Sequence, residues 1–253
     1  MKSYKLRRKT ADTAIYALLT LLAIVWLLPI AYLVLQSFRA ESGAYTDYII
    51  PKQFTLDNYI RLFTETDLFN YPRWYLNTLV VSIFTCIIST LMILMISYTF
   101  SRLRFASRKT FMNIGLILGM FPGFMSMIAV YYLLKIIGLE QSLVSLVLVY
   151  SSSAALGYFV AKGFFDTLPR SLDEAATIDG ASRNQIFWRI ILPLSKPIIV
   201  YTALTSFVAP WADFIFVSVI MKDNYSQYTL SLGLFQMLSR ENIFAYFTRF
   251  CAG

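Results

Sequence analysis

Histidine is absent from this 253-residue chain, and charged residues make up only 14% of it. Without histidine the chain cannot build a His-based catalytic triad, a His proton relay or a His zinc site. Its two cysteines, Cys86 and Cys251, are too few for a disulfide framework or a metal cluster. No G-x-x-x-x-G-K-[ST] segment occurs, which excludes a P-loop for ATP. We therefore expect no metal site and no bound nucleotide in this chain.

Apolar residues, by contrast, are abundant. They make up 58% of the sequence, and the mean hydropathy is +0.62. Soluble domains carry about 45–50% apolar and about 25% charged residues. The charge present here is too little to cover a soluble protein of this length, and the apolar content is too high for a disordered chain. The composition predicts a membrane protein.

Five long apolar stretches match the length needed to cross a membrane, which is about 20 residues. Four of them carry no charge, at 15–38, 74–101, 110–134 and 141–161; the fifth, at 197–221, carries one, Asp213. A sixth apolar run begins near Ile243. Gly119, Pro122 and Gly123 interrupt the third stretch. We predict an all-α, polytopic membrane protein with a single transmembrane domain over residues 1–253.

The loop charges predict the orientation of these spans. Lys and Arg number five in the N-terminal segment, four in loop 102–109 and five in loop 162–196, so 14 lie on one side of the membrane. Loops 39–73, 135–140 and 222–241 carry four, one and two, so seven lie on the other. By the positive-inside rule, the N-terminus and loop 162–196 are cytoplasmic. The net charge of +8 is then a topology signal, with lipid headgroups as its partner, and we expect no nucleic-acid binding.

The long cytoplasmic loop, at residues 169–193, has strong helix signals of its own. Ser171 and Glu174 have the spacing of one capping box, and Ser182 and Gln185 have the spacing of another. Gly180 falls where the first of the two helices must end, and glycine tolerates the left-handed turn that such an end requires. The loop is therefore predicted to form a helix, a tight bend and a second helix. Two prolines, at 193 and 197, then break the chain before the fifth span.

Seven residues of this loop also fit the EAA motif of ABC-importer permeases at every spacing: Glu174, Ala175, Ala176, Gly180, Ile190, Leu192 and Pro193. The chain thus resembles the transmembrane subunit of a bacterial ABC importer of type I. In that family the loop forms a coupling helix that docks on the ATPase. The resemblance implies that the docking residues are Glu174, Ala175, Ala176, Asp179 and Gly180. Capping by Glu174 is the simpler alternative, although one carboxylate can do both.

The resemblance extends over nearly the whole chain, to the shorter permease subunit of maltose/maltodextrin-type carbohydrate importers. Supporting segments are 74–79, 98–102, 173–182, 210–214 and 228–234. Family members continue through a full sixth span, whereas this sequence stops at Gly253, either because it is a truncated form or because the last helix is lost.

Function and partners follow from the same resemblance. It implies a subunit that forms half of the pathway for a maltodextrin-like oligosaccharide, in the plasma membrane of a bacterium. Its partners would be a second permease, two cytoplasmic ATPase subunits that bind ATP and Mg²⁺, and an extracellular sugar-binding protein. The chain itself would have no cofactor and would not be an enzyme.

Polar residues inside the spans are the candidates for pathway or subunit contacts. A charge at Asp213 costs about 2.5–3.5 kcal/mol in a membrane, so it should face a polar cavity or a partner. Trp211 offers a flat face to a sugar ring, and Tyr150 and Ser152 belong to a polar stripe in the fourth span. For Asp213, pathway lining and structural pairing with the neighbouring subunit both remain open.

Two other function classes fit less well. A stand-alone secondary transporter couples to ions through intramembrane acids, of which Asp213 is the only example. A membrane-embedded enzyme needs clustered acids or a nucleophile–base pair, and the acids here are scattered outside the EAA loop. A permease for another solute also stays open.

Overall fold

The computed structural model describes residues 2–121 and 123–253, and Pro122 lies outside the described residues. Within those ranges the regular elements are helices, apart from one isolated bridge between Arg39 and Phe54. The predicted all-α class is confirmed for this part of the chain. The chain divides into two compact units, Met1–Tyr71 with Leu234–Gly253, and Pro72–Gly233.

The first unit contains α1 (Lys2–Ser37), α2 (Asp57–Thr64) and α14 (Ile243–Ala252). The apolar part of α1, Ala11–Ser37, is long enough to cross a membrane. Residues 11–30 are exposed, so their side chains can face lipid or another protein, whereas Gln36 and Ser37 near the end of the helix are buried. Asn58 ties the unit together. Its amide donates to the carbonyls of Ser37 and Arg39 at 2.9 and 2.8 Å, and its oxygen accepts a 3.0 Å hydrogen bond from Thr248 of α14.

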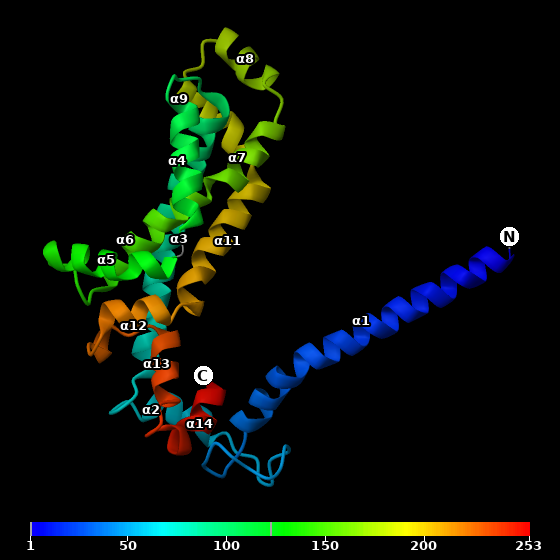
Figure 1. Cartoon of the computed structure of the whole chain (residues 1–253), viewed down its shortest axis with the longest axis vertical. Coiled ribbons are helices and arrows are strands. Elements are labelled where there is room, and N and C mark those ends of the chain that lie inside the picture. Colours follow the sequence, from blue (N-terminus) through cyan, green and yellow to red (C-terminus); the bar gives the residue numbers. More distant parts are fainter. Residues whose placement is uncertain (1, 122) are drawn as a thin grey trace. The chain divides into compact units, whose positions relative to one another are not determined.

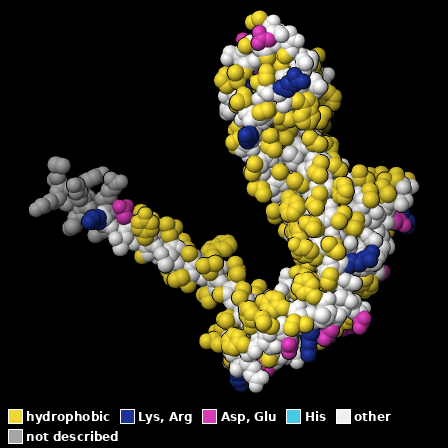
Figure 2. Space-filling view, turned by 180° about the vertical axis from the view of Figure 1, so that it is seen from behind, with side chains coloured by type: hydrophobic (Ala, Val, Ile, Leu, Met, Phe, Trp, Pro, Cys, Tyr) yellow, Lys and Arg dark blue, Asp and Glu magenta, His cyan; other side chains and the backbone are white. Residues whose placement is uncertain are grey.

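The second unit is built around α3 (Tyr71–Arg102), which covers the predicted second span. The helices α4 (Arg108–Met120), α7 (Tyr158–Thr167) and α11 (Lys196–Ala212) run beside it (Figure 1). Hydrophobic side chains cover much of the visible face of this bundle, and charged side chains gather towards its ends (Figure 2). This distribution matches a body that lies in hydrocarbon, with ends in water.

The other predicted spans are interrupted in the structure. The third consists of α4 and α5 (Gly123–Ile136), whose described parts meet at 105°. The fourth consists of α6 (Leu143–Ala154), a 3₁₀ turn η1 (Ala155–Gly157) and α7, with a 44° bend. The fifth ends as a regular helix at Ala212 and resumes in α12 (Ile215–Met221). By length and composition α1 and α3 can each cross a membrane, and the described helices make five spans if each bent pair counts as one.

Hydrogen bonds join two segments that are far apart in the sequence, residues 77–78 and 226–230, at one end of the second unit. The amide of Asn77 donates to the carbonyls of Ser226 and Tyr228 at 3.0 and 2.9 Å. The backbone N–H of Leu230 donates to the Thr78 hydroxyl at 2.7 Å. These contacts join α3 to the turn η3 (Tyr225–Gln227) and to the start of α13 (Leu230–Met237).

Gly233 completes this junction. The buried ring of Trp74 lies against it, and a Cβ at position 233 would overlap that ring. Glycine is needed here because two backbone segments approach closely.

Opposite this junction, the second unit carries α8 (Ser171–Ile178), α9 (Arg183–Ile186), a π-helical turn η2 (Phe187–Ile191) and α10 (Leu192–Leu194). The axis turns by 84° at Ser195, between the segments Arg183–Leu194 and Lys196–Ala212. Pro193 and Pro197 lie in the first turns of α10 and α11, on either side of the bend. The break predicted there is confirmed, because proline has no N–H to continue the helical hydrogen bonds.

Candidate functional site

The loop at residues 169–193, called the coupling loop here after the role that the resemblance implies, has the predicted helix–bend–helix form. After α8 the chain turns at Gly180, whose φ of +83° is in the left-handed region that favours glycine. Ser182 then caps α9: its hydroxyl accepts from the Gln185 N–H at 3.3 Å, and the Gln185 side chain accepts from the Ser182 N–H at 2.8 Å. The second capping box is confirmed.

The first capping box is wrong. Ser171 is the first residue of α8, Arg170 precedes it, and no side chain caps this helix. The N–H of Glu174 donates to the backbone carbonyl of Arg170 at 3.1 Å. Because Arg170 already has a helical backbone conformation, the helix starts one residue earlier than a Ser171 cap would require. The carboxylate of Glu174 is thus not used as a cap.

Arg102, at the end of α3, holds the loop in place. Its side chain is only 5% exposed and forms a 3.1 Å ion pair with Asp173 of α8. The same guanidinium donates to the carbonyls of Phe165 and Leu168 at 2.9 and 3.0 Å, in the segment that leads into α8. The sequence does not reveal this contact of Arg102, because nothing in the spacing links positions 102 and 173.

Apolar packing beneath α8 reinforces the ion pair. Ala176 is buried in a cluster with Tyr98 of α3, Phe165 of α7 and Phe187 of η2. The rings of Tyr98 and Phe187 lie 4.9 Å apart, and the Tyr98 hydroxyl donates to the Arg183 carbonyl at 3.3 Å. Ala176 therefore faces the chain's own core, unlike the outward role that the motif implied for it.

The outer face of α8 is free within this chain. Glu174, Ala175, Asp179 and Gly180 are exposed, and Ile178 is 87% exposed. Residues 174, 175 and 178 share one side of the helix. Ile178 was not among the predicted docking residues, although a bulky apolar side chain at the end of a short polar helix is a signal that could have identified it.

A charged pocket of about 350 Å³ lies beside this face. Its lining combines four guanidiniums with two carboxylates: Arg102, Arg104, Arg170, Arg183, Asp173 and Glu174. Glu174 forms no ion pair within the residues that the structure describes. The edge of the exposed face of α8 thus carries charges of both signs.

Four intramembrane residues were candidates for pathway or subunit contacts. Tyr150 and Asp213 contact each other, whereas Ser152 and Trp211 have other partners. The hydroxyl of Tyr150 donates to Asp213 Oδ2 at 3.0 Å, and the N–H of Phe216 donates to Asp213 Oδ1 at 3.0 Å. Asp213 therefore caps the start of α12 and links α6 to the interruption after α11. Both carboxylate oxygens have partners in this chain, so the structural pairing occurs within the subunit.

Ser152 and Trp211 lie apart from that pair. The Ser152 hydroxyl donates to the Leu148 carbonyl of its own helix at 2.6 Å. The ring of Trp211 packs edge-on against Tyr75 with centroids 5.3 Å apart, and its indole N–H has no acceptor among the described residues. The indole nitrogen of Trp211 is itself buried.

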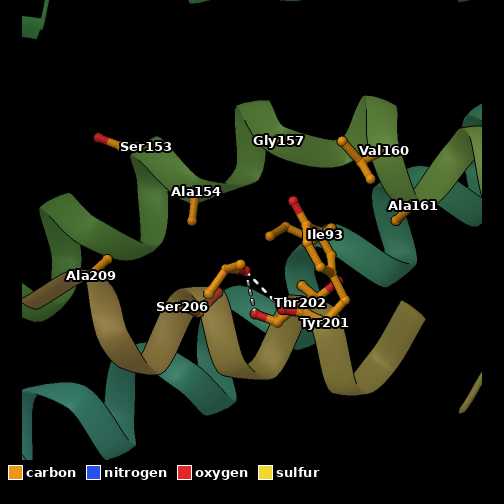
Figure 3. Close-up of a pocket in the computed structure, with 11 residues that line it drawn as sticks. Ile93, Ser153, Ala154, Gly157, Val160, Ala161, Tyr201, Thr202, Ser206 and Ala209 are labelled. Carbon is orange, nitrogen blue, oxygen red and sulfur yellow. Dashed lines mark hydrogen bonds between the residues drawn. The ribbon is translucent and has the colours of Figure 1, made fainter. Parts of the chain in front are cut away.

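A second pocket, of about 280 Å³, lies between α3, the α6–α7 break and α11 (Figure 3). Small side chains form much of its wall, including Ala154, Gly157 and Ala161. The hydroxyls of Thr202 and Thr205 donate to carbonyls of their own helix, so they offer little hydrogen bonding to a ligand. The pocket is suited to close packing by a helix or an acyl chain.

Comparison with known proteins places the chain in a family. Residues 93–251 match the family described as the inner membrane component of binding-protein-dependent transport systems. The chain belongs to this family. The matched region contains the coupling loop, Tyr150 and Asp213, so the described contacts lie in the part of the inner membrane component that defines it.

Two relatives from Bacillus subtilis (strain 168) are carbohydrate permeases by name. The galactooligosaccharides transport system permease protein is 37% identical over 250 residues, which cover 98% of this chain and 88% of the relative. A maltodextrin transport system permease protein is 35% identical over 225 residues, which cover 88% and 80%.

A solved bacterial ABC transporter involved in the import of the acidic polysaccharide alginate has a chain of similar fold. The TM-score is 0.81 at 22% identity, over 96% of this chain and 90% of that one. The predicted resemblance to an ABC importer permease is confirmed at the level of family and fold.

Proposed function

We propose that this inner membrane component forms half of the translocation pathway of an ATP-driven oligosaccharide importer. Its partners are a second permease, two cytoplasmic ATPase subunits and an extracellular sugar-binding protein. The N-terminus and the coupling loop lie in the cytoplasm, as the distribution of Lys and Arg favours. The chain contributes no chemistry of its own, and ATP and Mg²⁺ bind to the ATPase.

One observation supports the coupling role: the inner side of α8 is packed against α3, whereas its outer side is exposed. The Arg102–Asp173 ion pair and the buried Ala176 join α8 to the longest helix of the second unit. A force applied to the exposed side, at Glu174, Ala175 and Ile178, is therefore transmitted to α3 rather than absorbed by a loose loop. Transmission of this kind needs a packed, discrete contact, which these residues supply.

The substrate class follows from the named relatives, since carbohydrate permeases match over most of this chain. Maltodextrin and galactooligosaccharide relatives have similar identities, so we infer an oligosaccharide and treat the two as competing candidates. Trp211 and the Tyr150–Asp213 pair are the side chains that we propose to face the pathway or the second permease.

A stand-alone secondary transporter is the competing function, and Asp213 argues against it. An ion-coupling acid must exchange its proton or cation during transport, whereas both oxygens of Asp213 already accept hydrogen bonds that maintain the fold.

The test is uptake by vesicles that contain this chain together with a second permease and an ATPase from the same organism. We expect uptake of labelled maltotriose or of a galactosyl trisaccharide that requires ATP and the binding protein. Glu174→Ala should reduce uptake and leave membrane insertion unchanged, while Lys196→Gln, an exposed cation just beyond the loop, serves as the matched control. Uptake driven by an ion gradient in the absence of ATP would contradict the proposal.

A further inference from the structure

A third pocket, with a basic lining, lies where α3 ends and α4 begins. It has a volume of about 470 Å³ and is lined by Arg104, Phe105, Ala106, Arg108, Lys109 and Met112. Three of these six residues are cations and none is an acid. The pocket lies between two apolar helices that are joined by a five-residue turn, so it is at the level where hydrocarbon meets water.

Within residues 2–121 and 123–253 no ion pair involves Arg104, Arg108 or Lys109. The Nε of Arg108 is buried and has no hydrogen-bond partner there. Asp166, the acid whose charge interacts with Arg108, already accepts hydrogen bonds from Ser101 and Lys162.

The backbone adds to the positive potential. The 13-residue helix α4 begins at Arg108, and no side chain caps its start. The free N–H groups at the start of a helix attract anions. A pocket with a buried, unpartnered guanidinium nitrogen and an uncapped helix start therefore favours an anion with several acceptor oxygens, for which Arg is the best-suited side chain.

The other half of the lining is apolar. Phe105 stacks on Phe100 with ring centroids 6.0 Å apart, and it remains 38% exposed. Phe111, next to the pocket on α4, is 55% exposed. A free anion or an acidic protein side chain would leave this surface uncovered, whereas the glycerol and acyl carbons of a lipid would cover it.

We propose that this pocket binds the phosphodiester headgroup of an anionic phospholipid. The phosphate lies among Arg104, Arg108 and Lys109, and the first carbons of the acyl chains pack on Phe105 and Met112. Arg104 also lines the charged pocket beside α8, and Arg102 is two residues away. The bound lipid therefore stabilises the end of α3 on which the coupling loop rests, a role that adds to the proposed transport function and does not depend on it.

The experiment measures lipid retained by the assembled transporter after extraction from membranes of equal phosphatidylglycerol and phosphatidylcholine content. Native mass spectrometry counts the lipids on each complex. We expect phosphatidylglycerol to be retained selectively. Arg104→Gln and Arg108→Gln should each weaken its retention about five-fold, since a cation near an anionic surface contributes about 1 kcal/mol.

Matched variants separate this site from general charge. Arg189→Gln removes an exposed cation that does not line the pocket, and it should leave retention unchanged. Arg108→Lys keeps the charge, and therefore the topology signal, and should recover part of the retention. Co-purification with the partner subunits verifies that each variant is folded.

A third arm distinguishes the lipid from free phosphate. Phe105→Ser should weaken phosphatidylglycerol retention without changing the binding of inorganic phosphate. Equal retention of both lipids by the unaltered protein would overturn the proposal, as would equal losses in Arg108→Gln and Arg189→Gln. A photo-crosslinker at position 109 that labels the ATPase instead of lipid would also overturn it.

Discussion

Removal of the Arg102 guanidinium should release the coupling loop from α3. Arg102→Met keeps the length and apolar stem of the side chain and deletes three contacts, to Asp173, Phe165 and Leu168. Asp173→Ala deletes the ion pair from the other side. In the double variant the ion pair is removed once, whereas the sum of the two single variants counts its loss twice. The difference between that sum and the effect of the double variant is therefore the free energy of the pair.

The magnitude follows from burial. Loss of one partner of a fully buried ion pair costs about 3–5 kcal/mol. Here Arg102 is 5% exposed but Asp173 is 21% exposed, so water can partly solvate the remaining carboxylate, and we expect about 2 kcal/mol for the pair. Arg102→Met also leaves the carbonyls of Phe165 and Leu168 without this donor, and each lost bond adds about 1–3 kcal/mol.

Amide hydrogen exchange is the appropriate assay, because the expected event is a local opening rather than global unfolding. Exchange over α8 and α9, residues 171–186, should accelerate about 30-fold in Asp173→Ala, which corresponds to a loss of about 2 kcal/mol, and by more in Arg102→Met, which also loses two carbonyl contacts. Exchange in the middle of α3 should not change in either variant. Arg189→Met, at an exposed position of the same loop, is the control. In the assembled transporter, sugar moved per ATP hydrolysed should fall in parallel.

Two results would refute this reasoning. If the effects of Arg102→Met and Asp173→Ala simply add in the double variant, the two side chains do not interact. If exchange over 171–186 accelerates while sugar moved per ATP stays constant, the seating of α8 on α3 is not the route of coupling.

Three further outcomes are expected. Gly180→Val should force a β-branched residue to a φ of +83°, misdirect α9 and reduce ATPase co-purification; normal co-purification would contradict the docking role of the bend. Asp213→Ala should lower thermal stability by about 2–4 kcal/mol, because it removes both the Tyr150 bond and the α12 cap, whereas Asp213→Asn should cost little; unchanged stability of Asp213→Ala with lost transport would instead indicate a pathway role. Gly233→Ala should destabilise by about 3 kcal/mol or more, and Trp74→Leu in the same chain should rescue part of the loss measured by thermal aggregation, since the added Cβ overlaps the Trp74 ring.

The sequence predicts the coupling loop well because its signals are local. The capping box at Ser182 and the glycine at 180 act within a few residues, and both appear in the structure as expected. The predicted cap at Ser171 is wrong because Arg170, the residue before it, already has a helical conformation. The pattern S-x-x-E does not distinguish a helix that starts after Ser171 from one that starts at Ser171.

The interruptions and the long-range contacts were harder to predict. The interruption of the third span was signalled by its glycines, since α4 ends next to Gly119 and α5 begins at Gly123. The predicted fourth and fifth spans are apolar on all sides, so periodicity gives no sign of where these helices bend. The break at Asp213 depends on Tyr150, 63 residues earlier in the chain, and on a cap within α12. The inward position of Ala176 likewise depends on Phe165 and Phe187, which only the tertiary fold brings beneath α8.

The junction of Asn77 and Thr78 with residues 226–230 has a consequence for biogenesis. During synthesis α3 leaves the ribosome about 150 residues before the segment that satisfies its polar side chains. Until then the Asn77 amide is without its two carbonyl partners, near the start of a long and mostly apolar helix. A polar group without a hydrogen-bond partner in or near hydrocarbon has a high free energy. The incomplete protein therefore has an unsatisfied amide until the last part of the second unit is synthesised. A membrane quality-control system that recognises unsatisfied amides in a bilayer would then act on chains whose synthesis stops between residues 78 and 226.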